Sequence, residues 1–303
     1  MEVSQLSRFP SPLRYPGGKG KIANFVKILM IENGLAGRDY VEPYAGGASV
    51  ALSLLFEGYA DRAFINDLNP GVHAFWSSAV SRTDELCALI ETTPVTMQTW
   101  QEQREIANSP EAEGLDLGFA TFFLNRTNRS GIISGGVIGG LDQTGQWKID
   151  ARYNVESLVQ RIRKIGRHRS SIVVSNEDAV QFVRRWSDPA EDAAFLYLDP
   201  PYFEKGEGLY DNFYDAADHA EIADSVAHLA HPWIVSYDAR PEITQLYPDA
   251  LQIRYGLTYS AHRDSASGSE IMFFSDGLKV PEMLPNGISI SQVVKAQRLA
   301  LAK

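Results

Sequence analysis

The stretch Phe195-Leu196-Tyr197-Leu198-Asp199-Pro200-Pro201-Tyr202 decides the fold class of this chain. Its first four residues are large and apolar without polar alternation, which is typical of a strand buried on both faces of a parallel sheet. Ligands of such sheets bind beyond the carboxyl ends of the strands, so Asp199 stands where chemistry is expected.

The residues after this strand carry three groups that suit a planar amine. The two prolines keep the chain extended, so that the carbonyl of Pro200 projects beside the carboxylate of Asp199. Pro201 has no N–H that competes for a nearby carbonyl, and Tyr202 adds a flat ring. Together they can grip the exocyclic amine of a nucleobase turned out of its helix. The same residues also fit a plain strand end with a proline turn and an Asp cap, so the rest of the chain must discriminate.

Composition places the chain among ordinary globular proteins. Its 303 residues are 44% hydrophobic and 22% charged, enough for one large core or a core with a subdomain. No apolar run approaches the length of a membrane span, and Met1 to Pro12 lacks a signal-peptide core. Cys87 is the only cysteine. These features predict a cytoplasmic protein without disulfides or a membrane partner, and no metal ion is expected.

The charge distribution favours a nucleic-acid partner although the net charge is −10. Residues 126–185 carry eleven basic side chains against five acidic ones, while the rest of the chain is strongly acidic. A basic face on an acidic body suits a local, steered contact with double-stranded DNA. A solvated helix surface around Arg161 to Arg169 is the alternative reading of the same charges.

Two glycine-containing stretches near the N-terminus predict a cofactor pocket. Gly17, Gly18 and Lys19 precede a helical pattern over 22–31, and the exposed N–H groups of such a helix start can seat a carboxylate. The spacing does not match a nucleotide-binding phosphate loop.

A strand, a glycine turn and a helix follow, through Glu42, Tyr44, Gly46 and Gly47. The next strand ends at Asp67, about 20 residues beyond the glycines, where an acid can hold the ribose hydroxyls of an adenosine cofactor. A helix cap is the alternative role of Asp67. The turn lacks the dinucleotide fingerprint, which favours S-adenosylmethionine over NAD.

The middle of the chain predicts a separate subdomain. Residues 71–130 are mainly helical in pattern, and the glycine-rich piece that follows predicts a β-hairpin with its tip near Asp142 to Gly145. Polar side chains in and around it are predicted to contact DNA: Asn125, Arg126, Asn128, Arg129, Gln143, Gln146, Lys148 and Arg152.

The remaining strands complete an α/β fold. Strands are predicted at 172–175 and 233–238, and 252–255 with 271–274 are predicted to form an antiparallel pair. We therefore expect a Rossmann-like sheet with helices on both faces, from residues 1–70 and 170–285. The predicted target-recognition subdomain covers 71–169, and a short helix or tail covers 286–303.

With these motifs in place, the chain resembles the Dam-like (D12 class) DNA adenine-N6 methyltransferases, from about Leu13 to Ser275. The resemblance is carried by five motifs in the family's order: Tyr15-Pro16-Gly17-Gly18-Lys19, Glu42-Pro43-Tyr44 with its glycine turn, Asp67, Asn125-Arg126-Thr127 and Asp199-Pro200-Pro201-Tyr202.

The resemblance implies a role for each matching position. Tyr15, Lys19, Asp67 and Asp199 would line the S-adenosylmethionine pocket, with Tyr44 and Asp178 close to the cofactor. The predicted cofactor set also includes Gly17, Gly18, Glu42 and Gly46, and the predicted catalytic set is Asp199, Pro200, Pro201 and Tyr202. Ala48 departs from the family's pattern, because a glycine commonly ends this turn. The glycine-rich piece differs from the commonest Dam pattern, so no target sequence is carried over.

The sequence thus predicts a site-specific DNA adenine-N6 methyltransferase, a monomer in solution and a monomer or dimer on DNA. Cytosine N4 or an RNA base presents the same kind of amine and stays an alternative acceptor. A catalytically silent DNA-binding protein and an NAD-linked oxidoreductase are alternatives from other classes. The complete Asp199 motif counts against the first, and the missing dinucleotide fingerprint counts against the second.

Overall fold

The chain forms two compact units in the computed structural model, which describes residues 10–15, 19–188, 194–203, 214–258 and 267–302. Unit 1 comprises Met1–Gly18 and Asn69–Asn176, and unit 2 comprises Lys19–Leu68 and Glu177–Lys303. Their junctions at 68/69 and 176/177 lie close to the boundaries at 70/71 and 169/170 that the sequence predicts. The assignment of unit 1 to target recognition stays a prediction.

Unit 2 contributes six strands to a mixed sheet, in the order β2-β1-β4-β5-β7-β6. Strand β1 is parallel to β2 and β4, and β4 is parallel to β5, whereas β7 runs antiparallel to β5 and β6. The strands are β1 (Arg38–Glu42), β2 (Ala60–Asn66), β4 (Ala194–Leu198), β5 (Trp233–Asp238), β6 (Leu251–Thr258) and β7 (Ser267–Phe274). The predictions of a buried central strand before Asp199 and of a terminal antiparallel pair are confirmed.

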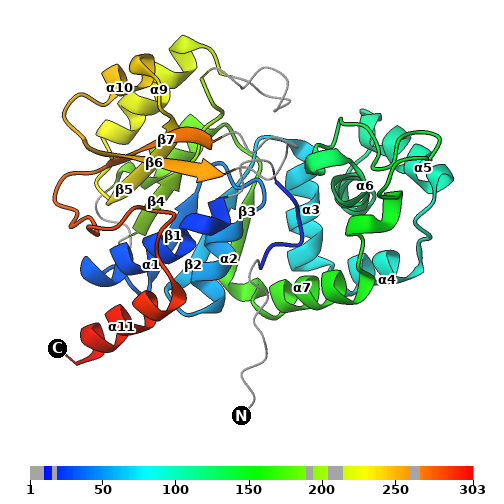
Figure 1. Cartoon of the computed structure of the whole chain (residues 1–303), viewed down its shortest axis with the longest axis horizontal. Coiled ribbons are helices and arrows are strands. Elements are labelled where there is room, and N and C mark those ends of the chain that lie inside the picture. The colour runs from blue at the N-terminus through cyan, green and yellow to red at the C-terminus, as the bar shows by residue number, and fades with distance from the viewer. Residues whose placement is uncertain (1–9, 16–18, 189–193, 204–213, 259–266, 303) are drawn as a thin grey trace. The chain divides into compact units, whose positions relative to one another are not determined.

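Helices cover both faces of this sheet, because the strands direct apolar side chains to each face. Leu196, Val235 and Phe273 point to one core, which also takes in apolar residues of α8 (Ala179–Arg184), α9 (Ala216–Ala227) and α10 (Pro241–Leu246). On the opposite face Phe25 of α1 (Ala23–Glu32) packs on Phe274, with ring centroids 6.1 Å apart. Helix α2 (Ser49–Phe56) lies beside α1, and α9 and α10 lie across the sheet from them (Figure 1). The α/β fold with helices on both faces is as predicted.

The C-terminal helix belongs to unit 2. Helix α11 (Ile290–Leu301) packs on α1, and Asn24 Nδ2 donates a hydrogen bond to the carbonyl oxygen of Ile288 at 3.2 Å. The predicted tail is therefore a helix that covers α1. Within the described residues, no helix combines the length and apolar character that crossing a membrane requires.

Unit 1 is built around one buried helix. Helix α6 carries Phe122, which stacks on Phe75 of α3 with centroids 5.7 Å apart, and α4 and α5 pack on it as well. Asn69 caps the start of α3 through the N–H groups of Gly71 and Val72. The elements of unit 1 are α3 (Pro70–Ser81), α4 (Thr83–Thr92), α5 (Met97–Asn108), α6 (Gly114–Thr127), α7 (Val155–Arg167) and the short strand β3 (Ile172–Ser175). The predicted helical character is confirmed (Figure 1).

The predicted β-hairpin after α6 is wrong. Residues 132–148 form turns, with one isolated bridge between Asn128 and Val137, and lie between short 3-10 helices at Arg129–Gly131 and Ile149–Arg152. Gly139 and Gly140 have φ angles of 90° and 79°, which lie outside the extended region that a strand requires. The glycines therefore turn the chain instead of marking a hairpin tip.

The close crossing of α3 and α6 generates a prediction. A Cβ at Gly118 would lie 2.6 Å from the carbonyl oxygen of Ala74, so Gly118→Ala must push the two helices apart. We expect the free energy of unfolding to fall by about 1–3 kcal/mol in chemical denaturation. Gly136→Ala is the matched control, because a Cβ there meets nothing within 4 Å. Equal stability of the two variants would contradict this packing.

Candidate active site

Asp199 lies directly beyond the carboxyl end of β4 and is held from two sides. Its Oδ1 accepts a hydrogen bond from Ser236 Oγ at 2.8 Å and lies 3.2 Å from the ammonium of Lys19. Ser236 is positioned by the neighbouring strand β5 and is itself hydrogen-bonded to the hydroxyl of Tyr197 at 2.9 Å. The Asp199 side chain keeps 23% of its surface exposed. One carboxylate oxygen is thus fixed while the side chain still faces solvent.

Lys19 joins Asp199 to Tyr202 and to an acid that the sequence reading missed. The ammonium lies 2.9 Å from the hydroxyl of Tyr202 and 2.8 Å from Glu270 Oε2. The Tyr202 hydroxyl donates to Glu270 Oε1 at 2.5 Å. Lys19 begins the 3-10 helix η1 (Lys19–Ile22) ahead of α1, whereas Glu270 lies on β7. An acid next to the apolar run Ile271 to Phe274 was the available signal for Glu270.

The electrostatics of this cluster follow from burial and from the shared cation. Burial raises the pKa of Asp199 and of Glu270, and the positive charge of Lys19 opposes both shifts. Burial by itself would lower the pKa of Lys19, but Asp199 and the other acidic groups around it raise that pKa well above its usual value. Lys19 therefore stays charged between two carboxylates.

The glycine turn after β1 is held by Asp67. The N–H of Gly46 donates to Asp67 Oδ2 at 2.8 Å, and Asp67 directly follows β2. Gly46 and Ala48 both have φ angles of 44°, so the alanine that departs from the family's pattern adopts the left-handed conformation that favours glycine. The turn thus brings its backbone to the carboxyl edge of β1 and β2.

Glu42, the last residue of β1, supports the same turn. It is buried, and its Oε2 accepts a hydrogen bond from the N–H of Ala51 in the first turn of α2 at 3.2 Å. Burial raises the pKa of Glu42 well above its usual value. Its carboxyl group therefore anchors the start of α2.

The other predicted cofactor residues are placed separately. The hydroxyl of Tyr44 is hydrogen-bonded to that of Tyr214 at 2.9 Å, and Asp178 Oδ1 caps α8. Tyr15 is half-buried in unit 1. Gly17 and Gly18 lie outside the described residues. Of the predicted catalytic residues, Pro200 is buried and Pro201 half-buried beside Asp199.

Two of the predicted DNA-contacting residues are buried inside unit 1. Asn125 accepts from the N–H of Arg14 at 2.8 Å and donates to the carbonyl oxygens of Arg14 and Gly131 at 2.7 and 2.8 Å. Asn128 accepts from Trp100 Nε1 at 2.7 Å and donates to the carbonyls of Ile132 and Ile133. Each is at most 1% exposed. The prediction that Asn125 and Asn128 contact DNA is therefore wrong, because their amides satisfy buried backbone groups.

Two further residues of the predicted DNA-contacting set, Gln143 and Arg126, form hydrogen bonds within unit 1. Gln143 donates to the carbonyls of Ile138 and Gly140, and its Oε1 accepts from the N–H of Ile149 at 2.9 Å. The guanidinium of Arg126 donates to the carbonyl oxygen of Arg152, and burial lowers the pKa of Arg126 to about 9. Gln143 and Arg126 thus bond within unit 1 but stay half-exposed, and their contact with DNA stays a prediction. The remaining predicted residues are exposed: Arg129, Gln146, Lys148 and Arg152.

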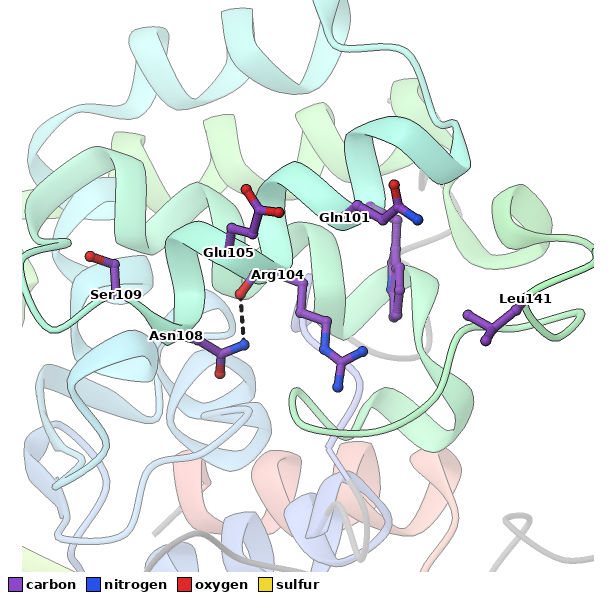
Figure 2. Close-up of a pocket in the computed structure, with 7 residues that line it drawn as sticks. Gln101, Arg104, Glu105, Asn108, Ser109 and Leu141 are labelled. Carbon is purple, nitrogen blue, oxygen red and sulfur yellow. Dashed lines mark hydrogen bonds between the residues drawn. The ribbon is translucent and has the colours of Figure 1, made fainter.

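A surface pocket of unit 1 is separate from these residues. It lies between one side of α5 and Leu141, and Asn108 Nδ2 donates to the carbonyl oxygen of Arg104 at its rim (Figure 2). Arg104 also lies over the ring of Trp100, 5.2 Å from its centroid. The lining includes none of the residues that the sequence predicts to act on a substrate or cofactor.

The internal bonding of Asn125 generates a prediction. Asn125→Ala should lower the free energy of unfolding by about 1–3 kcal/mol, because it removes the buried amide that bonds to the backbone of Arg14 and Gly131. Arg129→Ala is the control, since Arg129 is exposed and its removal should change stability by less than about 0.5 kcal/mol. A stable Asn125→Ala protein with weakened DNA binding would contradict the correction.

Comparison with known proteins identifies the family. The family model described as "D12 class N6 adenine-specific DNA methyltransferase" matches residues 15–261. No curated protein sequence matches the chain. Among solved structures, a protein from Pyrococcus horikoshii described as a "putative RNA methyltransferase" aligns with 10% sequence identity and a TM-score of 0.42. That alignment covers 87% of this chain and 88% of the other. On the family match, with the Asp199 motif at the carboxyl edge of the sheet, the chain belongs to the D12 class of N6 adenine-specific DNA methyltransferases.

Proposed function

We propose that this protein transfers a methyl group from S-adenosylmethionine to N6 of a specific adenine that is turned out of double-stranded DNA. The observation that carries the proposal is the state of Asp199. Its Oδ1 is fixed by Ser236 and Lys19, and among the described residues its Oδ2 has no hydrogen-bond partner. An acceptor oxygen fixed at the carboxyl edge of a parallel sheet suits an amine donor.

Asp199 and Pro200 would activate the amine by accepting its two hydrogens. The lone pair of an adenine amine is delocalised into the ring, which makes the nitrogen a poor nucleophile. Acceptance by the Asp199 carboxylate and the Pro200 carbonyl draws the nitrogen toward tetrahedral geometry and localises the lone pair. The proton that leaves the nitrogen passes to solvent or to Asp199. The acceleration then comes from orientation and fixed dipoles.

Tyr202 would stack on the extruded base. Such stacking contributes roughly 1–3 kcal/mol per base. The Tyr202 hydroxyl is held by Lys19 and Glu270, so the ring has a fixed orientation before a base arrives. Pro201 joins the ring to the catalytic carboxylate through a stiff backbone.

The donor set of unit 2 fits a cationic adenosine cofactor. Asp67 after β2 suits ribose hydroxyls, and Asp199 with Glu270 places two carboxylates around one ammonium, an excess of negative charge that suits a sulfonium. When bound, S-adenosylmethionine supplies an electrophilic methyl group. The residues of unit 2 proposed to hold it are Lys19, Glu42, Tyr44, Gly46, Asp67, Asp178 and Asp199.

DNA would bind through exposed side chains of unit 1. Arg129, Lys148 and Arg152 suit phosphate contacts, and the exposed amide of Gln146 suits a base edge. The state proposed is a monomer in solution and a monomer or dimer on DNA.

The acceptor can be identified directly. DNA and RNA are incubated with the protein and labelled S-adenosylmethionine, and the nucleosides are then separated by mass analysis. Label in N6-methyl-2′-deoxyadenosine from DNA supports the proposal. Label only in N4-methylcytosine or in RNA would replace the acceptor with one of the alternatives, and absence of label from all nucleosides would refute methyl transfer.

Removal of the Asp199 carboxylate should abolish turnover. We expect Asp199→Ala to lower kcat by about 100- to 1,000-fold or more, because the fixed acceptor is lost, while the Kd for duplex DNA changes little. Asp276→Ala, at an exposed turn of the same unit, is the matched control and should keep normal turnover. Near-normal turnover of Asp199→Ala would refute the role assigned to this carboxylate.

Ser236→Ala should shift the pH dependence of methyl transfer. Activity requires ionised Asp199, and the Ser236 hydrogen bond lowers a pKa that burial has raised. Loss of that bond raises the pKa further, so the acidic limb of the kcat/KM profile should move up by about one pH unit. Ser225→Ala, a buried serine on α9 that donates to the Glu221 carbonyl, should leave the limb in place. An unshifted limb in Ser236→Ala would show that Ser236 does not tune Asp199.

A further inference from the structure

Glu270 lies at the active-site edge of the sheet because β7 is antiparallel to its neighbours β5 and β6. In the β5–β7 register Glu270 is opposite Asp238, the last residue of β5, and in the β6–β7 register it is opposite Tyr255. A residue near the start of the antiparallel strand thus reaches the edge where β4 and β5 end. Glu270 is 1% exposed, so its carboxylate is desolvated and depends on its partners.

The carboxylate of Glu270 contacts two groups of the site, the Lys19 ammonium and the Tyr202 hydroxyl. Its Oε2 lies 2.8 Å from the Lys19 ammonium, and its Oε1 accepts the Tyr202 hydroxyl at 2.5 Å. The second acid beside Lys19, Asp199, lies farther from the ammonium, at 3.2 Å. Glu270 therefore takes the closer ion pair with Lys19 and leaves Asp199 the longer one.

We propose that Glu270 is a positioning residue for methyl transfer: it draws the Lys19 ammonium toward β7 and fixes the Tyr202 ring, so that Asp199 keeps an oxygen for the amine. This inference rests on the proposed function. Without the Glu270 charge, Lys19 would pair with Asp199 alone. The ammonium would then compete with the amine for the carboxylate, and the Tyr202 hydroxyl would lose its charged acceptor.

The groups that face this carboxylate set the direction of its pH effect. They are Lys19 from η1, Asp199 and Tyr202 beyond β4, Asp238 from β5 and Tyr255 from β6. Burial raises the pKa of Tyr255, so this tyrosine stays neutral over the working range. Loss of the negative charge of Glu270 lowers the pKa of Asp199, because the Lys19 ammonium is then no longer shared.

The test compares Glu270→Gln with the wild-type protein in methyl transfer to DNA. We expect kcat to fall about 10- to 100-fold, while KM for DNA and the Kd for S-adenosylmethionine change less than threefold. The acidic limb of the kcat/KM profile should move to lower pH. If Glu270 had only a structural role, Glu270→Gln would lower the amount of active protein and leave the acidic limb of the kcat/KM profile in place. That result would overturn the proposal.

Two further variants keep the test decisive. Glu57→Gln is the matched control, because Glu57, which follows α2, pairs at 2.7 Å with Lys27, another buried lysine, on α1, and the change should leave kcat and the acidic limb unchanged. If Glu270→Gln does not fold, Tyr202→Phe removes only the hydroxyl that Glu270 accepts and should lower kcat at near-normal KM for DNA. Normal kcat in Tyr202→Phe would overturn the positioning role while methyl transfer by the wild-type protein stands. A wild-type protein without methyl transfer would instead refute the function itself.

Discussion

The sharing of one buried ammonium by two carboxylates is the constraint on which the active site depends. Lys19 lies within 3.2 Å of Asp199 and 2.8 Å of Glu270, and all three side chains come from different parts of unit 2. A buried carboxylate is tolerable only when it is paired and hydrogen-bonded. The ion pairs therefore fix η1, the end of β4 and the start of β7 relative to one another, and the geometry that stabilises this corner also orients the Asp199 carboxylate.

The parts of the fold that the sequence predicted well are those with a strong local pattern. The apolar run before Asp199 is a buried central strand, and Asp67 follows β2 beside the glycine turn, because strand order and turn chemistry act over a few residues. The Lys19, Asp199 and Tyr202 motifs were recognisable for the same reason. Glu270 was missed because its role depends on the β5–β7 register, which brings it to a site 251 residues from Lys19 along the chain.

The errors in unit 1 have one physical cause. Polar residues such as Asn125 and Asn128 look like surface groups in a sequence, but here their side-chain amides bond to backbone groups that the turns leave without ladder partners. Glycine-rich chain without regular structure needs such internal donors and acceptors. The sequence shows the amides and the glycines separately, and only the folded arrangement shows that one satisfies the other.

The antiparallel course of β7 also determines when during synthesis an enzyme of this design becomes complete. The ribosome makes Lys19 and Asp199 long before Glu270, which follows them on the last strand of the sheet. Until that strand inserts between β5 and β6, Lys19 lacks its closer counter-ion and the Tyr202 hydroxyl lacks its carboxylate acceptor. A nascent or truncated chain that ends before β7 would therefore contain the whole Asp-Pro-Pro-Tyr motif without the carboxylate that pairs with Lys19 and Tyr202.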